Sequence, residues 1–145
     1  MKVLIVTGTP GTGKTTFAKQ LAQKKHYQYV DVNALISKHH LHDGYDKKLK
    51  TKLIDTKKLS IFLSTYVTSL KAKGVVIDSH LSHYLPASFV DACYVTVCSL
   101  PVLKQRLKKR RYSTQKIKAN LEAEAFQTCF IEAQDAGHKI VVKHT

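Results

Sequence analysis

Apolar residues along the chain follow two spacings, which predict strands and helices in turn. Residues 2–7 hold a continuous run rich in β-branched side chains, as in a strand that is covered on both faces. Shorter runs of the same character predict strands at residues 27–32, 75–77, 91–97 and 139–142. Apolar positions at helical spacing, together with helix start and stop signals, predict helices at residues 14–25, 33–40, 57–72, 101–110 and 113–136.

This alternation predicts an α/β fold, with a parallel sheet of five strands and helices on both faces. A length of 145 residues suits one domain with a single core. Asp43-Gly44 is interpreted as a turn, and the lysine-rich segment 46–58 is expected to be exposed. Ligands of such sheets bind beyond the carboxyl ends of the strands, where both Gly8 and Asp78 fall.

Residues 8–15, GTPGTGKT, match the phosphate-loop pattern GxxxxGK(S/T) between a predicted strand and a predicted helix. Glycines let backbone N–H groups turn inward and approach phosphate oxygens at a helix N-terminus. Lys14 would place a cation against the β- and γ-phosphates, and the hydroxyl of Thr15 would bind Mg²⁺. Thr16 lies one step further along the first helical turn. The sequence therefore predicts a nucleoside triphosphate site, and a chance glycine-rich turn is the weaker alternative because both flanking elements fit.

Asp78 follows the apolar run 75–77, so its carboxylate is expected at the end of a strand beside the loop. A carboxylate in this position holds Mg²⁺ in phosphate-loop proteins, usually through water. A helix cap or a surface position is the alternative role for this residue. His80 stands two residues later and could orient water or relay a proton near the γ-phosphate, although a lone histidine after a strand often has no such role.

Arg106, Arg110 and Arg111 form a cationic cluster on or just after a predicted helix. Arg106 and Arg110 are four residues apart and could therefore face the same direction. Because phosphoryl transfer concentrates negative charge on oxygens, a movable arginine would stabilise the reacting group. The alternative is a solvated basic helix end that the helix dipole favours.

The net charge of +14 comes from 24 Lys and Arg against 10 Asp and Glu, with basic clusters at residues 47–58 and 104–118. Such an imbalance favours a polyanionic partner such as a nucleotide, RNA or an acidic protein segment, and a solubilising surface is the alternative. No run approaches the roughly 18 apolar residues of a membrane span. The apolar run at the N-terminus is also too short for a signal peptide, so we expect an intracellular protein with reduced cysteines and no membrane contact.

Several short motifs together resemble one known family. They are GTPGTGKTT (8–16), DGYD (43–46), IDSHLSHYLP (77–86), LKKRRYS (107–113) and NLEAE (120–124). In order and spacing they are similar, over nearly the whole chain, to the adenylate kinase isoenzyme 6 family, called coilin-interacting nuclear ATPase in animals. The Asp-x-His pair formed by Asp78 and His80 is the feature that separates this family from ordinary adenylate kinases.

The resemblance implies a compact phosphate-loop kinase fold with a monophosphate-binding segment at about residues 30–53 and a short lid at about residues 109–118. It implies ATP and Mg²⁺ as cofactors, with Thr15 and Asp78 as the metal-binding residues. The catalytic residues that it implies are Lys14, Asp78, His80 and Arg110. The ATP contacts that it implies are Gly11, Gly13, Lys14, Thr15, Thr16 and the lid residue Arg110.

The family resemblance also implies activities and partners. The family is described as having adenylate kinase and ATPase activity and as acting in late maturation of the small ribosomal subunit. The implied partners are AMP or another nucleoside monophosphate, a ribosomal protein of the small-subunit platform, and the pre-ribosomal particle, with which the basic charge would allow rRNA contact. The short chain without an acidic C-terminal tail favours an archaeal cytoplasm, and a nuclear location would suit a eukaryote.

Two positions depart from the family pattern. Arg111 stands where the family often has a glycine after the lid arginine, which could alter lid motion. Ser37 stands where an arginine is common, and Lys38 follows it. An AMP phosphate needs a cation, and lysine is a weaker bidentate partner than arginine, so monophosphate binding is less strongly predicted than ATP binding.

The sequence leaves more than one function open. The first is a kinase that transfers the γ-phosphoryl group of ATP to AMP or a similar acceptor. The second is an assembly ATPase in which water, held by His80, replaces AMP. The third is an RNA- or protein-binding module that only senses nucleotide. The presence of Lys14, Thr15 and Asp78 favours an active site over the third hypothesis, but it does not separate the first two.

Overall fold

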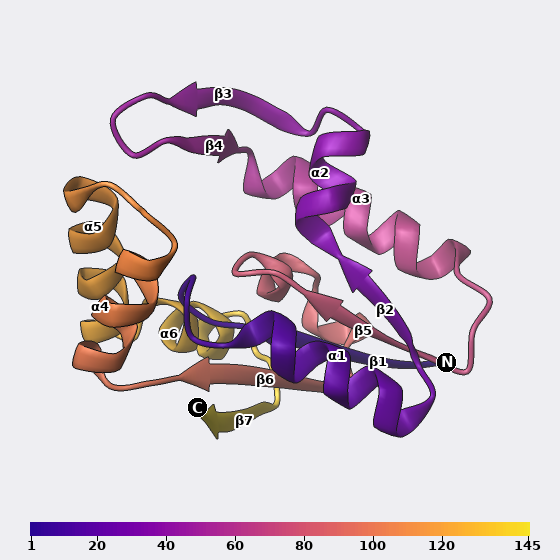
Figure 1. The fold of residues 1–145 in the computed structure, drawn as a ribbon. Helices are drawn as coiled ribbons and strands as arrows, with labels where there is room; N and C mark the ends of the chain where they lie inside the picture. The colour runs from indigo at the N-terminus through magenta and orange to yellow at the C-terminus, as the bar shows by residue number, and fades with distance from the viewer.

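The structure, a computed structural model, describes residues 1–145 and is built on a central parallel sheet (Figure 1). Its five strands lie in the spatial order β2-β5-β1-β6-β7, and every neighbouring pair is parallel. Their bounds are β1 Lys2–Thr7, β2 Gln28–Asp31, β5 Gly74–Asp78, β6 Ala92–Val97 and β7 Ile140–His144. The predicted five-stranded parallel α/β fold is therefore confirmed.

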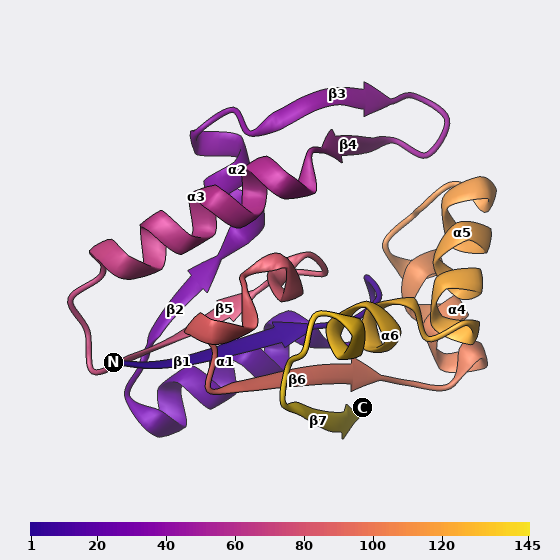
Figure 2. The same cartoon turned by 180° about the vertical axis from the view of Figure 1, so that it is seen from behind.

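Helices cover both faces of this sheet. In Figure 1 α1 lies in front of the strands, and in Figure 2, seen from behind, α6 lies in front of them. The six helices are α1 Lys14–Lys25, α2 Val32–Lys38, α3 Thr56–Ser69, α4 Leu100–Lys109, α5 Thr114–Ala125 and α6 Thr128–Asp135. Two short 3-10 turns, at Ser82–Tyr84 and Ala87–Phe89, join β5 to β6. None of the helices combines the length and the apolar character that crossing a bilayer requires.

The core is divided by β1, whose successive side chains point to opposite faces of the sheet. Val3 and Ile5 belong to the larger cluster, to which α2, α3 and α6 also contribute. Leu4 and Val6 belong to a smaller cluster formed with α1. A strand that is buried on both faces needs a continuous apolar run, which explains the pattern at residues 2–7.

An antiparallel hairpin lies outside the main sheet and was not predicted. Its strands are β3 His42–Asp46 and β4 Thr51–Ile54. The interpretation of Asp43-Gly44 as a turn is wrong, because both residues lie within β3, where the pairing register shifts between His42 and Gly44. The chain instead turns after Asp46, whose carboxylate accepts hydrogen bonds from the backbone N–H groups of Lys48 and Leu49, each at 3.0 Å.

The prediction of one long helix over residues 113–136 is also wrong. The segment forms α5 and α6, which are separated at Gln127, where the backbone is left-handed with φ of 54°. The break has a packing reason. Ala133 of α6 is buried in the larger core cluster and Phe130 packs against that cluster, whereas α5 buries no residue fully and packs beside α4. One straight helix could not pack both beside α4 and into the larger core cluster.

Candidate functional site

The loop between β1 and α1, residues 8–13, has a backbone that only glycine allows at its ends. Gly8 has φ of 147°, and a Cβ atom there would lie 2.5 Å from Oγ1 of Thr96. Gly13 has φ of 87° and forms the N-cap of α1. Within the loop, the hydroxyl of Thr12 donates a 2.6 Å hydrogen bond to the carbonyl of Thr9. These features hold the loop in a tight curve over the carboxyl end of β1.

The N-terminus of α1 differs from those of three other helices. Side chains of Asp31, Asp55 and Ser113 accept hydrogen bonds from the first backbone N–H groups of α2, α3 and α5. Gly13 supplies no such cap to α1, and no acidic residue lies in its first turn. The unpaired N–H groups and the positive end of the helix dipole therefore remain available to an anion.

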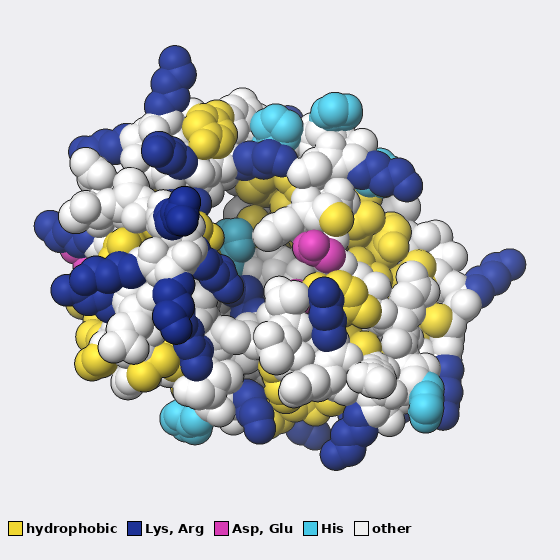
Figure 3. Space-filling view, viewed as in Figure 1, with side chains coloured by type: hydrophobic (Ala, Val, Ile, Leu, Met, Phe, Trp, Pro, Cys, Tyr) yellow, Lys and Arg dark blue, Asp and Glu magenta, His cyan; other side chains and the backbone are white.

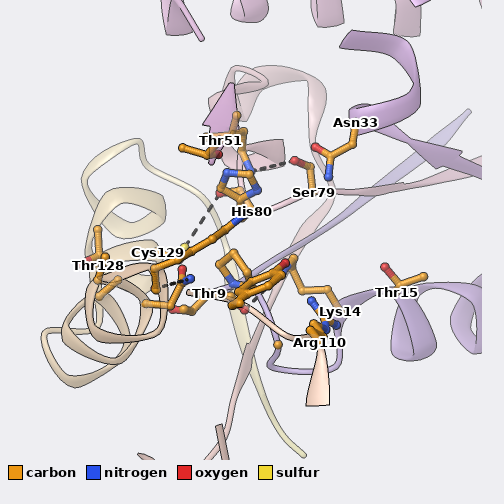
Figure 4. Close-up of a pocket in the computed structure, with 18 of the residues that line it drawn as sticks. Thr9, Lys14, Thr15, Asn33, Thr51, Ser79, His80, Arg110, Thr128 and Cys129 are labelled. Atoms are coloured by element: carbon orange, nitrogen blue, oxygen red, sulfur yellow. Dashed lines mark hydrogen bonds between the residues drawn. The ribbon is translucent and has the colours of Figure 1, made fainter. Parts of the chain in front are cut away.

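The ammonium of Lys14 lies beside the phosphate loop, near the N-terminus of α1. Its ammonium donates a 3.3 Å hydrogen bond to the carbonyl of Thr9. Burial lowers the pKa of Lys14 to about 8, and the positive charge of Arg110 contributes to the lowering while Asp78 opposes it. In Figure 4 Lys14 and Arg110 point to the same part of the cavity. Two cations that face one pocket suit a phosphate ligand.

Asp78 ends β5 and is 3% exposed. Its Oδ2 accepts a 2.8 Å hydrogen bond from the hydroxyl of Thr15 and a 2.6 Å hydrogen bond from the hydroxyl of Tyr29. Burial and the hydrogen bond to Asp78 raise the pKa of Tyr29, so its hydroxyl keeps its proton and donates. Because both bonds go to one oxygen, Oδ1 is left for a ligand in the cavity.

The oxygens of Thr15 and Asp78 fit Mg²⁺ in type and number. In phosphate sites Mg²⁺ is held by one or two protein oxygens, and phosphate oxygens and waters complete its shell. Here a hydroxyl and a carboxylate lie within 2.8 Å of each other at the opening of the loop. When bound at such a place, Mg²⁺ neutralises charge on the phosphates.

His80 lies just beyond Asp78 and lines the cavity above Lys14 (Figure 4). Burial and the nearby charge of Lys14 lower the pKa of His80 to about 4. The imidazole ring is therefore uncharged at neutral pH, when one of its nitrogens can accept a hydrogen bond. The thiol of Cys129 donates to the backbone carbonyl of His80 at 3.9 Å, which fixes this turn against α6.

Two cavities meet at His80. The first, of about 480 Å³, lies over the loop and extends to the segment after α4, to α5 and to α6. The second, of about 500 Å³, lies between α2 and the β3–β4 hairpin. Four residues line both: Asn33, Thr51, His80 and Leu81. The face in Figure 3 is hollowed at its centre, and Lys and Arg side chains gather on the side of α4 and α5. A molecule in one cavity would therefore lie directly beside a molecule in the other.

Comparison with known proteins identifies the family. Residues 4–127 match the family model described as an AAA domain. The chain is 36% identical over 141 residues to an adenylate kinase isoenzyme 6 homolog of Schizosaccharomyces pombe, a match that covers 97% of this chain and 79% of the relative. The chain belongs to the adenylate kinase isoenzyme 6 family. An adenylate kinase isoenzyme 6 homolog of Caenorhabditis elegans is 32% identical over 139 residues, which are 96% of this chain and 76% of the relative.

The fold of this adenylate kinase isoenzyme 6 family member also occurs in a solved structure of another kinase. Shikimate kinase from Acinetobacter baumannii, in complex with shikimate, aligns with a TM-score of 0.64 at 12% identity, and the alignment covers 100% of this chain and 85% of that one. At this identity the likeness shows the fold alone, which is that of the phosphate-loop kinases. The fold therefore does not distinguish one phosphoryl acceptor from another.

In this adenylate kinase isoenzyme 6 family member, the residues predicted from the sequence line the first cavity and a further cavity on the outer side of the loop. The first cavity is lined by Gly11, Lys14, Thr15, Asp78, His80 and Arg110. Gly13 and Thr16 line this outer cavity of about 570 Å³, to which Gly11 and Arg110 also contribute.

The other two arginines of the predicted cluster lie away from the first cavity. Arg106 lines the outer cavity together with Arg110 but does not line the first. Its guanidinium donates instead to the carbonyl of Gly11 at 3.3 Å. Arg111 is exposed and has a left-handed backbone with φ of 58°.

Two further residues of the site were not singled out from the sequence. Tyr29 holds Asp78, and no local pattern indicates this contact because 49 positions separate them. Glu124 lies in the NLEAE motif, but the motif alone assigned it no role. Its carboxylate accepts a 3.0 Å hydrogen bond from the hydroxyl of Thr9 and a 3.1 Å hydrogen bond from the backbone N–H of Cys98. Glu124 thereby connects α5 to the loop and to the end of β6.

Proposed function

We propose that this protein is a nucleoside monophosphate kinase of the adenylate kinase type, which converts ATP and AMP into two molecules of ADP. The observation that carries this proposal is the meeting of the two cavities at His80. One cavity lies over the phosphate loop and the other is enclosed by the segment that the family resemblance assigns to the monophosphate. Membership of the adenylate kinase isoenzyme 6 family supports a nucleotide kinase on independent grounds.

ATP would bind with its phosphates on the loop. The uncapped N-terminus of α1 and the Lys14 ammonium would hold the phosphate oxygens. Thr15 would bind Mg²⁺ directly and Asp78 would bind it through water. The remaining ATP contacts are proposed for residues of the first and outer cavities: Gly11, Gly13, Thr16 and Arg110.

AMP would bind beneath the monophosphate-binding segment, which we place at residues 30–53. The lid, at residues 109–118, runs from the end of α4 into α5. Its Lys116 ammonium donates a 3.2 Å hydrogen bond to the carbonyl of Lys50 at the tip of the hairpin. This contact joins the lid to the monophosphate-binding segment across the mouth of the site, as exclusion of water from a phosphoryl transfer requires.

Transfer would rest on positioning and electrostatics, with no covalent intermediate. Lys14 and Arg110 face the place where charge develops on the γ-phosphoryl group. His80 stands where the two cavities meet, so its uncharged ring could accept a hydrogen bond from the attacking group. Without AMP, water in the same place would give the ATPase activity that we propose as the secondary reaction.

The role in late small-subunit maturation is carried over from the family resemblance. The net charge of +14 and the basic side chains over α4 and α5 support contact with rRNA or with a pre-ribosomal particle (Figure 3). If rRNA contact contributes, affinity for a small-subunit RNA fragment should fall steeply between 50 and 200 mM salt. Binding that is absent or independent of salt would leave the basic surface as a solubilising one.

A paired assay tests the kinase proposal. ADP formation from ATP and Mg²⁺ is measured with and without AMP, while consumption of AMP is followed by chromatography. We expect AMP to be consumed, with two ADP formed for each ATP used. A rate that ignores AMP and leaves it intact would reject the kinase and favour the ATPase. Lys14→Ala should abolish both reactions, and retained turnover would mean that the site lies elsewhere.

A further inference from the structure

The second cavity is positively charged. Eleven residues line it, and none of them is acidic. Lys50 and Lys52, both from the β3–β4 hairpin, supply its positive charge. The rest of the lining includes the apolar or aromatic side chains Ile36, Tyr45, Leu53, Ile54 and Leu81. An anion attached to a flat or apolar group fits this combination better than a polyhydroxylated acceptor does.

Lys52 is held across this cavity by a neutral partner. Its ammonium donates a 2.6 Å hydrogen bond to the hydroxyl of Ser37 on α2. The ion pairs of the structure involve Lys2, Lys58 and His83, so no carboxylate neutralises Lys52. An ammonium has three donors, and one hydrogen bond to a hydroxyl leaves two of them for a ligand.

The hydrogen bond to Ser37 also places the ammonium of Lys52 beside the wall of the cavity that α2 forms. Lys38 follows Ser37 directly and is the nearest cation along the chain. Both lysines are exposed, but Lys38 does not line the cavity, whereas Lys52 reaches the side chain of Ser37 from the opposite wall. The cation beside Ser37 in this cavity therefore comes from β4 and not from α2.

We propose that Lys52, positioned by Ser37, binds the phosphate group of the acceptor in the second cavity. This inference rests on the proposed kinase function and deepens it, because it names the residue that would hold the phosphate of the acceptor. Lys50 lines the same cavity from the hairpin turn, but no hydrogen bond to α2 positions its ammonium there.

Calorimetric titration of the full chain with AMP tests this assignment, and adenosine serves as the probe that lacks the phosphate. Lys52→Ala should weaken AMP binding by at least about tenfold, as loss of a hydrogen bond to a charged group does. Affinity for adenosine and for ATP should change less than about twofold. Lys38→Ala is the matched control, since it removes a lysine next to Ser37 that lies outside the cavity, and it should leave AMP binding unchanged.

A second variant tests whether a cation supplied by α2 can replace Lys52. Ser37→Arg in the Lys52→Ala background should recover most of the AMP affinity, because the cation then comes from α2. An unchanged AMP affinity in Lys52→Ala, an equal loss for adenosine, or a loss in Lys38→Ala would each overturn the assignment to Lys52. Failure of the unmodified chain to bind AMP at all would instead overturn the proposed kinase function, and this inference with it.

Discussion

The hydroxyl of Thr15, in the first turn of α1, donates a 2.8 Å hydrogen bond to Oδ2 of Asp78, at the end of β5. The two residues are 63 positions apart in sequence and come together because β1 and β5 are parallel neighbours in the sheet. Parallel strands end at the same edge of the sheet, so a residue in the helix that follows β1 can meet the last residue of β5. The contact links the phosphate-binding half of the site to its carboxylate.

Tyr29 is predicted to position Asp78 for Mg²⁺. Tyr29→Phe removes the 2.6 Å hydrogen bond to Oδ2 but keeps the ring, so apparent Mg²⁺ affinity should fall about tenfold, as for other partners of metal ligands. Binding of ATP without Mg²⁺, followed by fluorescence, should not change. Asp78→Asn should remove the Mg²⁺ dependence altogether. A Tyr29→Phe protein with unaltered Mg²⁺ affinity would show that Thr15 alone orients the carboxylate.

Lys14 is predicted to lower the stability of the nucleotide-free protein. Its pKa is about 8 in the folded protein and 10.5 in the unfolded chain, so the unfolded chain binds the proton more tightly. Stability is therefore lost as the pH falls from about 10.5 to about 8, and it stays reduced at neutral pH. Lys14→Met should raise the free energy of unfolding at pH 7 by about 1–2 kcal/mol, since part of the side chain remains in water.

The pH dependence of the Lys14→Met effect provides its control. In thermal unfolding at pH 7 the variant should melt roughly 3–6 °C above the unmodified chain while losing ATP binding. The difference should shrink towards pH 10.5, where neither state keeps the full charge of the lysine. A variant that melts lower at pH 7 would show that the lysine stem, and not its charge, dominates this position.

His83 is predicted to make the fold sensitive to acid. It is 2% exposed, and its Nδ1 lies 2.7 Å from the hydroxyl of Thr7. Burial lowers the pKa of His83 below its usual 6.5, although Glu132 opposes the change. The unfolded chain then gains a proton that the folded protein does not, so stability falls as the pH drops below about 6.5. Urea unfolding at pH 7.5 and 5.0 should show that His83→Gln loses less stability on acidification than the unmodified chain, and equal losses would contradict this role.

Glu124 is predicted to hold the loop against α5. Glu124→Ala removes the acceptor of both the Thr9 hydroxyl and the Cys98 N–H, which should cost about 1–3 kcal/mol in urea unfolding. Glu122→Ala is the matched control on the same helix, because the Glu122 side chain is exposed, and it should cost less than about 0.5 kcal/mol. Equal costs for the two variants would mean that helix propensity alone is being measured.

Elements that are defined by local pattern were predictable from the sequence. β1 and β5 are continuous apolar runs because both of their faces are buried, and the glycines at 8 and 13 mark a backbone that other residues strain. The β3–β4 hairpin was missed because its residues are partly or fully exposed and show no alternation of apolar and polar positions. The break at Gln127 was missed because the helical spacing continues through it.

The sequence by itself determined that a phosphate loop lies between a strand and a helix, with Lys14 and Thr15 at the start of that helix. Tertiary structure alone decided which distant side chains meet there. Tyr29 reaches Asp78 through the pairing of β2 with β5, and Lys52 reaches Ser37 because the hairpin folds back over α2. The physical reason is that periodicity reports how each segment is buried, whereas a contact between distant residues depends on how the packed segments are placed. By sequence order the cation beside Ser37 would be Lys38, but in the folded chain it is Lys52.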